Sequence, residues 1–232
     1  MSLGSTTSSA PGNIRVDFIS DVTCPWCAIG LASFEEALRS VGGSVQVDLR
    51  FQPFELNPDM GPEGQDVSEY LGEKYGSTQE EQAQVHESIR QRGAEVGFQF
   101  APGGRGRVWN TFDAHRLIYW AGAEARSGQQ LMLKRSLMEG YHGRGESPAD
   151  RSVLLKAVVH AGLSERRAGE VLDSDEFAHS VRERENFYAA NGIRSVPSVV
   201  LNGRYLVTGG QPPSVFEQML RQLQQELEAP RA

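Results

Sequence analysis

The two cysteines of this 232-residue chain are the residues whose spacing could do chemistry. Cys24 and Cys27 stand three positions apart in the stretch "DVTCPWCA", and the chain has no others. Three interpretations are open: a redox-active pair, half of a metal site, or two small core residues that are close by coincidence. Two cysteines placed at random are this close in about one chain per hundred, so coincidence is disfavoured.

A metal site needs more ligands than the sequence offers. Structural zinc takes four tetrahedral ligands, so two would have to join the cysteines. The five histidines do not form a pair with zinc-finger spacing; they are His86, His115, His142, His160 and His179. We therefore expect no metal.

The redox interpretation fits the local pattern. Residues Ile14 to Ser20, "IRVDFIS", alternate apolar and polar positions and predict a strand, and a helical pattern follows the cysteines. Pro25 suits the first helical turn, which places Cys24 at a helix N-terminus, where free N–H groups stabilise a thiolate. We expect Cys24 to be the nucleophile and Cys27, one turn later, the resolving thiol. Asp21 would either oppose the acidity of Cys24 or accept the proton of Cys27.

The elements around the pair predict an α/β domain split by helices. The strand at 14–20, a helix ending at Gly42-Gly43 and a strand at 44–54 form a βαβ unit with parallel strands. From 61 to 174 helical patterns dominate, so we expect an all-helical domain inserted there. A helix, a hairpin around Asn202-Gly203 and a last helix then return to the first domain. We therefore assign 14–60 and 175–232 to one domain, and 1–13 to a disordered tail.

Two other segments carry residues typical of substrate or phosphate binding. In "IRSVP", Pro197 opens a predicted strand, where it is either a tolerated first residue or a cis proline that frees the preceding backbone to bind an extended substrate. The loop "APGGRGRVWN" at 101–110 lacks the strand and lysine of a phosphate-binding loop, and we interpret it as a mobile connector.

Composition and charge limit the binding partners and the cellular compartment that we expect for this chain. The formal charge is −7 with no Lys/Arg cluster, so we expect neither nucleic acid nor a membrane as partner. No apolar run approaches the roughly 20 residues of a spanning helix. The first residues lack the pattern of a secretory signal, so we expect a cytoplasmic protein. Structural disulfides are rare in that compartment, which favours a redox-active or a metal-binding pair.

The motifs together resemble one family. "VDFISDVTCPWCAIG", "RFQPFELNP", "NTFDAHRL" and "GIRSVPSVVLNGRYLVTGGQP" resemble DsbA-like oxidoreductases of thioredoxin fold, of the FrnE type, which are similar to 2-hydroxychromene-2-carboxylate isomerases and kappa-class glutathione transferases. The resemblance implies a thioredoxin fold with the helical domain between its βαβ and ββα halves. It implies a cis Val196-Pro197 bond facing Cys24, and places the segment from Asn110 to His115 on an inserted helix over the active site.

The departures from the family pattern favour dithiol exchange. Relatives that act as glutathione-dependent isomerases or transferases commonly carry serine in place of Cys24 and lack the second cysteine. Periplasmic relatives carry histidine where this chain has Trp26, so we expect a weaker oxidant here. The resemblance implies that Pro25, Trp26, Val196 and Pro197 help to bind the substrate.

Asn110 and His115 are further candidates for the substrate site. Asn110 is expected to cap a helix, with Asp113 completing a capping box. His115 is either a core histidine bonded to a backbone carbonyl or a histidine lining the site that tunes Cys24.

The expected function is thiol–disulfide exchange, with no bound cofactor. The substrate would be a protein disulfide or dithiol, or a small molecule, with glutathione as an optional co-substrate. The alternatives are a glutathione-dependent isomerase or transferase acting on a small aromatic or polyketide-like substrate, and a redox-regulated holdase. The sequence leaves the oligomeric state open.

Overall fold

The computed structural model describes residues 13–126 and 128–228, and its centre is a four-stranded sheet. The strand order is β2 (Val47–Pro53), β1 (Ile14–Ser20), β5 (Ser198–Leu201) and β6 (Tyr205–Thr208). β1 pairs parallel to β2 and antiparallel to β5, and β5 pairs antiparallel to β6. The predicted βαβ unit is thus confirmed, and the predicted tail at 1–13 lies, apart from Asn13, outside the described residues.

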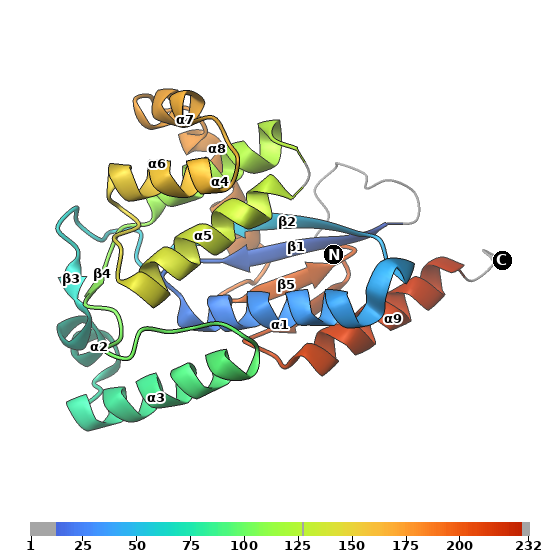
Figure 1. Ribbon diagram of the computed structural model, residues 1–232, viewed down its shortest axis with the longest axis horizontal. Helices are drawn as coiled ribbons and strands as arrows, with labels where there is room; N and C mark the ends of the chain where they lie inside the picture. The colour runs from blue at the N-terminus through green and yellow to red at the C-terminus, as the bar shows by residue number, and fades with distance from the viewer. Residues whose placement is uncertain (1–12, 127, 229–232) are drawn as a thin grey trace.

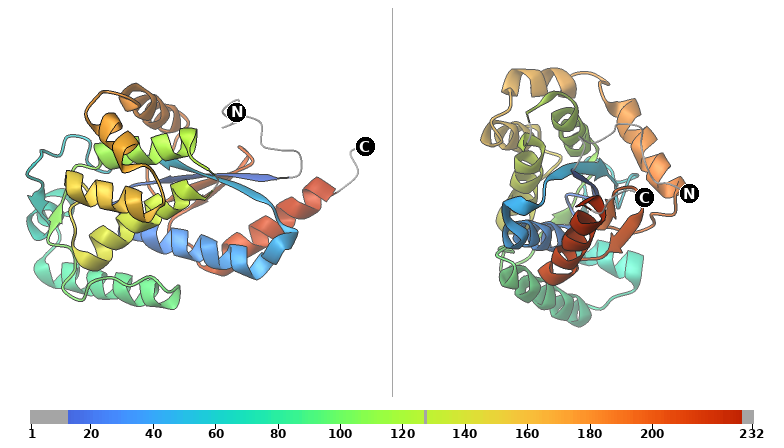
Figure 2. Two further views of the ribbon diagram at one scale, coloured as in Figure 1. Left: turned by 45° about the horizontal axis from the view of Figure 1, so that its top comes forward. Right: turned by 90° about the vertical axis from the view of Figure 1, so that its right-hand side faces the viewer.

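Both faces of β1 are covered, because alternate side chains pack on different helices. Phe18 contacts Phe34 of α1 (Pro25–Val41), and Phe34 contacts Phe216 of α9 (Pro213–Glu228). α1 and α9 lie side by side on this face (Figures 1 and 2). Ile19 points to the other face, where it packs with Tyr188 of α8 (Ala178–Ala190). All seven residues of β1 are buried as a result.

The hairpin that closes the sheet follows the predicted turn. Asn202 and Gly203 both have positive φ, of 50° and 66°, as the favoured tight turns require. The N–H of Arg204 donates to the carbonyl of Leu201 at 3.0 Å. The Asn-Gly signal therefore predicted this connection correctly.

The segment from 61 to 174 is mostly helical. The helices are α2 (Val67–Tyr75), α3 (Gln79–Glu95), α4 (Phe112–Glu124), α5 (Gln129–Arg144), α6 (Arg151–His160) and α7 (Glu165–Leu172). A short ribbon of β3 (Gln65–Asp66) and β4 (Arg107–Val108) also lies in this segment, so the prediction of an all-helical insertion missed one element. The domain boundaries stay a prediction.

The inserted segment lies against one edge and one end of the sheet. α4 and α5 contact β2, the edge strand. In Figure 1 the β3–β4 ribbon and α2 lie at the end where β1 stops and α1 starts. This is the end that carries the two cysteines.

Candidate active site

Cys24 and Cys27 lie at the first turn of α1, directly beyond the end of β1. Cys24 is the N-cap residue, with extended backbone angles, and Pro25 is the first helical residue. The N–H groups of Cys27 and Ala28 donate to the carbonyl of Cys24 at 3.1 and 3.3 Å. Both cysteines are free thiols, Cys24 being 4% exposed and Cys27 fully buried. An incoming reactant therefore meets Cys24 first.

The two thiols differ in acidity. The hydrogen bond from Cys27 lowers the pKa of the Cys24 thiol, and the positive charge of Arg105 acts in the same direction. Burial and the negative charge of Asp21 oppose this shift of the Cys24 pKa. Burial raises the pKa of Cys27 well above its ordinary value, and the adjacent Cys24 sulfur raises it further. The arrangement thus favours a thiolate at Cys24 and a protonated thiol at Cys27.

The segment before β5 faces the Cys24 sulfur. The Val196-Pro197 peptide bond is cis, as the resemblance implied, and the Cys24 thiol donates to the carbonyl of Val196 at 3.7 Å. Pro197 packs closely on α1 at Gly30, where a Cβ atom would come within 3.1 Å of the proline ring. Glycine at this position therefore allows the close approach of α1 and the proline.

Trp26 lies beside the pair and is 36% exposed. Its indole packs over Gly210, where a Cβ atom would come within 3.2 Å of the ring. Pro25 and Val196 are half-buried. Pro25, Trp26 and Val196 thus make the surface near the reactive thiol apolar. Their role in substrate binding stays a prediction.

Comparison with known proteins identifies the family. Residues 15–221 match the model of the DSBA-like thioredoxin domain. The chain belongs to this family. The fold and the resemblance inferred from the sequence motifs are therefore confirmed.

Solved structures of other proteins superpose on this one along most of its length. A probable DsbA oxidoreductase from Streptomyces coelicolor is 32% identical with a TM-score of 0.83, covering 95% of this chain and 93% of its own. A 2-hydroxychromene-2-carboxylate isomerase is 16% identical with a TM-score of 0.69, covering 94% and 100%. The cytosolic disulfide reductase DsbM from Pseudomonas aeruginosa, solved with GSH, is 16% identical with a TM-score of 0.63, covering 91% and 99%. The last two show the shared fold.

Asp21 is the acidic residue of the site in this DSBA-like chain. Its carboxylate is buried and accepts the N–H groups of Thr23 at 3.2 Å and Leu56 at 2.7 Å. Burial acts to raise the pKa of Asp21, but His115, the N–H of Leu56 and the positive charge of Lys134 outweigh it and lower the pKa to about 2. Such a weak base is a poor acceptor for the proton of Cys27. Of the two roles that the sequence left open, the structure favours opposition to the acidity of Cys24.

The backbone between β1 and Cys24 is held by side chains of the inserted segment. Three of its carbonyl groups accept from them: Ser20 from Lys134 Nζ at 3.4 Å, Val22 from His142 Nε2 at 3.0 Å, and Thr23 from Arg105 Nη1 at 2.6 Å. His115 adds a contact of 3.6 Å from its Nε2 to the Asp21 carboxylate. We call Arg105, His115, Lys134 and His142 the support cluster.

His115 lies on α4 next to the active site, and Asn110 lies just before this helix. His115 is 1% exposed, and its Nε2 has no hydrogen-bond partner among the described residues, so that nitrogen does not make the carbonyl bond that was one of the two alternatives. Asn110 accepts the N–H of Phe112 at 2.9 Å and donates to the carbonyl of Met60 at 3.1 Å. Their part in substrate binding stays a prediction.

The predicted capping box at the start of α4 is wrong. The N-cap residue is Thr111, one position later than expected, and its side chain makes no capping bond. Asp113 pairs instead with Arg116 at 2.8 Å. The nearby arginine provides a stronger partner than a backbone N–H, because that contact joins two full charges.

Sequence reasoning missed Arg105, Lys134 and His142. The loop at 101–110 is not the mobile connector that we expected, because Ala101 donates to the carbonyl of His142 at 2.9 Å and Arg105 bonds to Thr23. The available signal for Lys134 was a cation directly after the apolar run that ends at Leu133. A charge at such a position needs a buried partner.

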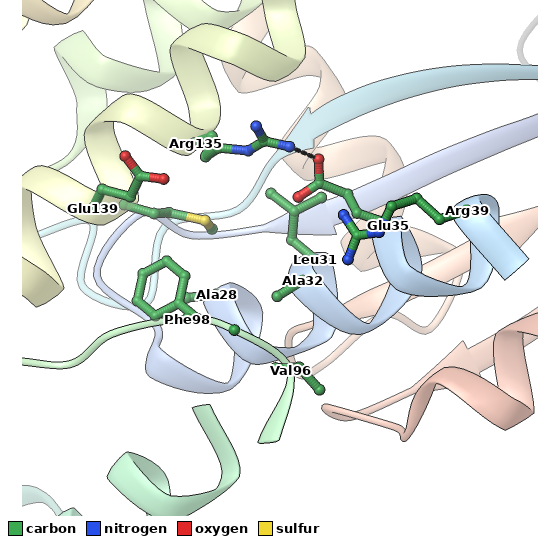
Figure 3. Close-up of a pocket in the computed structure, with 11 residues that line it drawn as sticks. Ala28, Leu31, Ala32, Glu35, Arg39, Val96, Phe98, Arg135 and Glu139 are labelled. Carbon is green, nitrogen blue, oxygen red and sulfur yellow. Dashed lines mark hydrogen bonds and ion pairs between the residues drawn. The ribbon is translucent and has the colours of Figure 1, made fainter. Parts of the chain in front are cut away.

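A cleft of about 240 Å³ lies farther along α1 (Figure 3). Ala28, Leu31 and Ala32 line one side of it, and an ion pair of Glu35 with Arg135 spans it. Cys24 does not line this cleft, which is also smaller than the usual ligand pocket of about 300–1,000 Å³. We therefore place the reactive surface at the start of α1 instead.

The described residues offer neither a metal-binding cluster nor a membrane-spanning helix. Among residues 13–126 and 128–228, no group of three or more His, Cys, Asp or Glu side chains could hold a metal ion. Within the same ranges, no helix is long and apolar enough to span a bilayer.

Proposed function

We propose that this DSBA-like protein is a thiol–disulfide oxidoreductase in which Cys24 is the nucleophile and Cys27 the resolving thiol. The observation that carries the proposal is the difference between the two sulfurs. Cys24 caps a helix N-terminus with a lowered thiol pKa, while Cys27 is fully buried with a raised one. Sequential exchange requires this difference, because one sulfur must attack the substrate while the other stays protonated until the mixed disulfide has formed.

In the reducing direction the exchange takes two steps. The Cys24 thiolate attacks one sulfur of a substrate disulfide, which forms a mixed disulfide and releases the first substrate thiolate. The Cys27 sulfur then loses its proton and attacks Cys24, which forms the Cys24–Cys27 disulfide and releases the second substrate thiolate. The substrate has gained two electrons and the protein has lost two. The reverse sequence oxidises a substrate dithiol.

A low-molecular-weight thiol would return the protein to the dithiol state. Two molecules of glutathione can do this, giving glutathione disulfide and the free cysteines. The structural likeness to a cytosolic disulfide reductase solved with GSH supports this proposal and a cytoplasmic location. The substrate would bind along the Val196 backbone, whose carbonyl adjoins the Cys24 sulfur, and against the partly exposed Trp26.

A glutathione-dependent isomerase is the competing function, because the isomerase noted above shares the fold. The presence of Cys27 favours exchange, since isomerisation with glutathione bound needs no resolving thiol.

Insulin reduction with glutathione as the electron source separates the two functions. We expect turnover by the native protein, no turnover by Cys24→Ser, and accumulation of a mixed disulfide in Cys27→Ser. A native protein that binds glutathione tightly but does not reduce insulin or a small disulfide would refute the oxidoreductase proposal.

A further inference from the structure

Arg105 is a half-buried cation beside the reactive cysteine, and it pairs with no carboxylate in the part of the chain that the structure describes. It belongs to the loop before β4, at the end of the sheet that carries the cysteines (Figure 1). Its Nη1 donates to the carbonyl of Thr23, the residue before Cys24, at 2.6 Å. Arginines elsewhere on the surface, such as Arg90 and Arg166, pair with carboxylates of their own helices. A lone cation at this position therefore calls for a functional explanation.

The loop that carries Arg105 is held in place by α5. The N–H of Ala101 donates to the carbonyl of His142 at 2.9 Å. The Tyr141 hydroxyl accepts a hydrogen bond from Arg105 and donates to the carbonyl of Arg107 at 2.8 Å. A guanidinium group has about five N–H donors, so several remain after the bonds to Thr23 and Tyr141. Arg105 is thus a positioned cation with donors left for a ligand.

Covalent geometry limits the distance from this cation to the Cys24 sulfur. The carbonyl oxygen of Thr23 and the Sγ atom of Cys24 are joined by a few covalent bonds that span at most about 6 Å. Because Arg105 Nη1 lies 2.6 Å from that oxygen, it is within about 9 Å of the sulfur. A disulfide that reacts with Cys24 and carries a carboxylate on a short chain can therefore reach the guanidinium group.

Two further cations at this end of the sheet have no carboxylate partner among the described residues. Lys74 of α2 donates to the carbonyl of Leu56 at 3.1 Å, and the N–H of Leu56 donates to Asp21, which precedes α1. The hydrogen bonds of Arg107, in β4, go to backbone carbonyls. Asp21 is itself buried, with both oxygens accepting N–H groups. Positive charge thus lies beside the loop that leads to the reactive cysteine, although the chain as a whole carries −7.

We propose that Arg105 binds a carboxylate of the substrate and so makes the protein selective for disulfides with a negative charge close to the reacting sulfur. The carboxylate accepts N–H groups of the guanidinium, a contact between two full charges. The Cys24 thiolate attacks the sulfur that is held in this way. The bond from Cys24 to this sulfur forms, the substrate S–S bond breaks, and the other half leaves as a thiolate with the electron pair. The proposal rests on the oxidoreductase function and names its substrate class.

Three small disulfides of equal chain length test this selectivity. They are the anion 3,3′-dithiodipropionate, the neutral 2-hydroxyethyl disulfide and the cation cystamine. The dithiol protein is mixed with an excess of each, and the loss of the Cys24 thiolate is followed by its ultraviolet absorbance. Each rate is divided by that of dithiothreitol with the same disulfide, which removes the reactivity of the reagent itself. We expect the anion to react about threefold to tenfold faster than the neutral disulfide, and the cation to react slowest.

Substitutions of Arg105 separate selectivity from thiol acidity. In Arg105→Met the ratio of the anionic to the neutral rate should fall by about threefold to tenfold. This variant also makes Cys24 less acidic, but that effect cancels in the ratio because the same thiolate attacks each disulfide. Arg105→Lys keeps the charge without the planar fork, so it should give an intermediate ratio. Arg166→Met removes an exposed arginine that is paired with Glu170, and it should keep the native ratio.

A pair of peptides identifies the source of the carboxylate, because a small acidic disulfide and an acidic side chain beside a cystine in a protein present the same group. Both peptides are cystine dimers, with either glutamate or glutamine next to the cysteine. An Arg105-dependent preference for the glutamate peptide supports the proposal with a protein as substrate. A preference confined to 3,3′-dithiodipropionate supports it with a small molecule as substrate.

The failures of the two proposals can be told apart. If the native protein reacts with none of the three disulfides, the oxidoreductase function is wrong. If it reacts without preferring the anion, or if Arg105→Met keeps the native ratio, the role of Arg105 is wrong. Should the Arg105 variants not fold, the native ratio is measured from low to high salt. A ratio that does not fall as the Debye length shrinks from about 30 Å to about 3 Å then overturns the proposal.

Discussion

Replacing Asp21 with asparagine should make the protein less stable and Cys24 more acidic at the same time. In the native protein the pKa of Asp21 is lowered from 3.8 to about 2. At about 1.4 kcal/mol per pKa unit, this difference corresponds to about 2.5 kcal/mol of stabilisation of the ionised form. The substitution removes that contribution at neutral pH, because asparagine has no charge.

Asparagine also leaves one hydrogen-bond donor without an acceptor. Both carboxylate oxygens of Asp21 are used, one by Thr23 and one by Leu56. Since asparagine has a single oxygen, its NH₂ group must face one of these N–H groups, and an unpaired buried donor costs about 1–3 kcal/mol. The total expected loss is therefore about 3.5–5.5 kcal/mol. Cys24 should titrate at lower pH, because the negative charge of Asp21 raises its pKa.

Denaturant titrations over a range of pH and the ultraviolet absorbance of the thiolate measure the two effects. The pKa of Asp21 is lower in the folded state, so its stabilisation is present above about pH 4 and is lost as the pH falls to about 2. Asp21→Asn should lack this dependence. The matched control is Asp59→Asn, which removes an exposed carboxylate. Unchanged stability of Asp21→Asn, or a Cys24 thiol that becomes less acidic, would refute the reasoning.

Three further outcomes are expected. Arg105→Met should raise the pKa of Cys24, because it removes a cation that lowers this pKa, and Arg105→Lys should restore part of the effect in the same thiolate titration. Burial raises the pKa of Glu55 to about 7. The native protein should therefore gain stability from this group as the pH falls from about 7 toward 4.5. Denaturant titrations should show no such gain in Glu55→Gln. Equilibration with glutathione should give a reduction potential below the roughly −120 mV of the strongest family oxidants, and Trp26→His should raise it.

The parts of the fold that the sequence predicted are those determined by short-range pattern. β1 follows an alternating run, α1 begins at Pro25 and ends before Gly42, and the hairpin follows Asn202-Gly203. Each of these signals lies within a few residues of the element that it specifies. The β3–β4 ribbon was missed because each of its strands is two residues long, too short to show alternation.

The sequence revealed the two cysteines of the site but not the side chains that hold the backbone before them. Spacing and the strand-to-helix junction identified Cys24 and Cys27, whereas the support cluster binds the backbone before them across long stretches of chain. Arg105, Lys134 and His142 lie 82, 114 and 120 residues from the backbone carbonyls that they bind. No local periodicity encodes such contacts, since they depend on how the inserted segment packs on the sheet.

The support cluster gives the inserted segment a role beyond covering the sheet. The carbonyls of Ser20, Val22 and Thr23 lie after the last residue paired in β1 or at its end, so side chains from elsewhere must satisfy them. The inserted segment supplies those side chains, and with them the charges that surround both sulfurs. A change in the packing of α5 therefore alters the backbone before Cys24 and the pKa of Cys27 together, because the charge of Lys134 on α5 lowers that pKa. Differences in this segment between DSBA-like proteins offer a physical route to different redox behaviour from the same pair of cysteines.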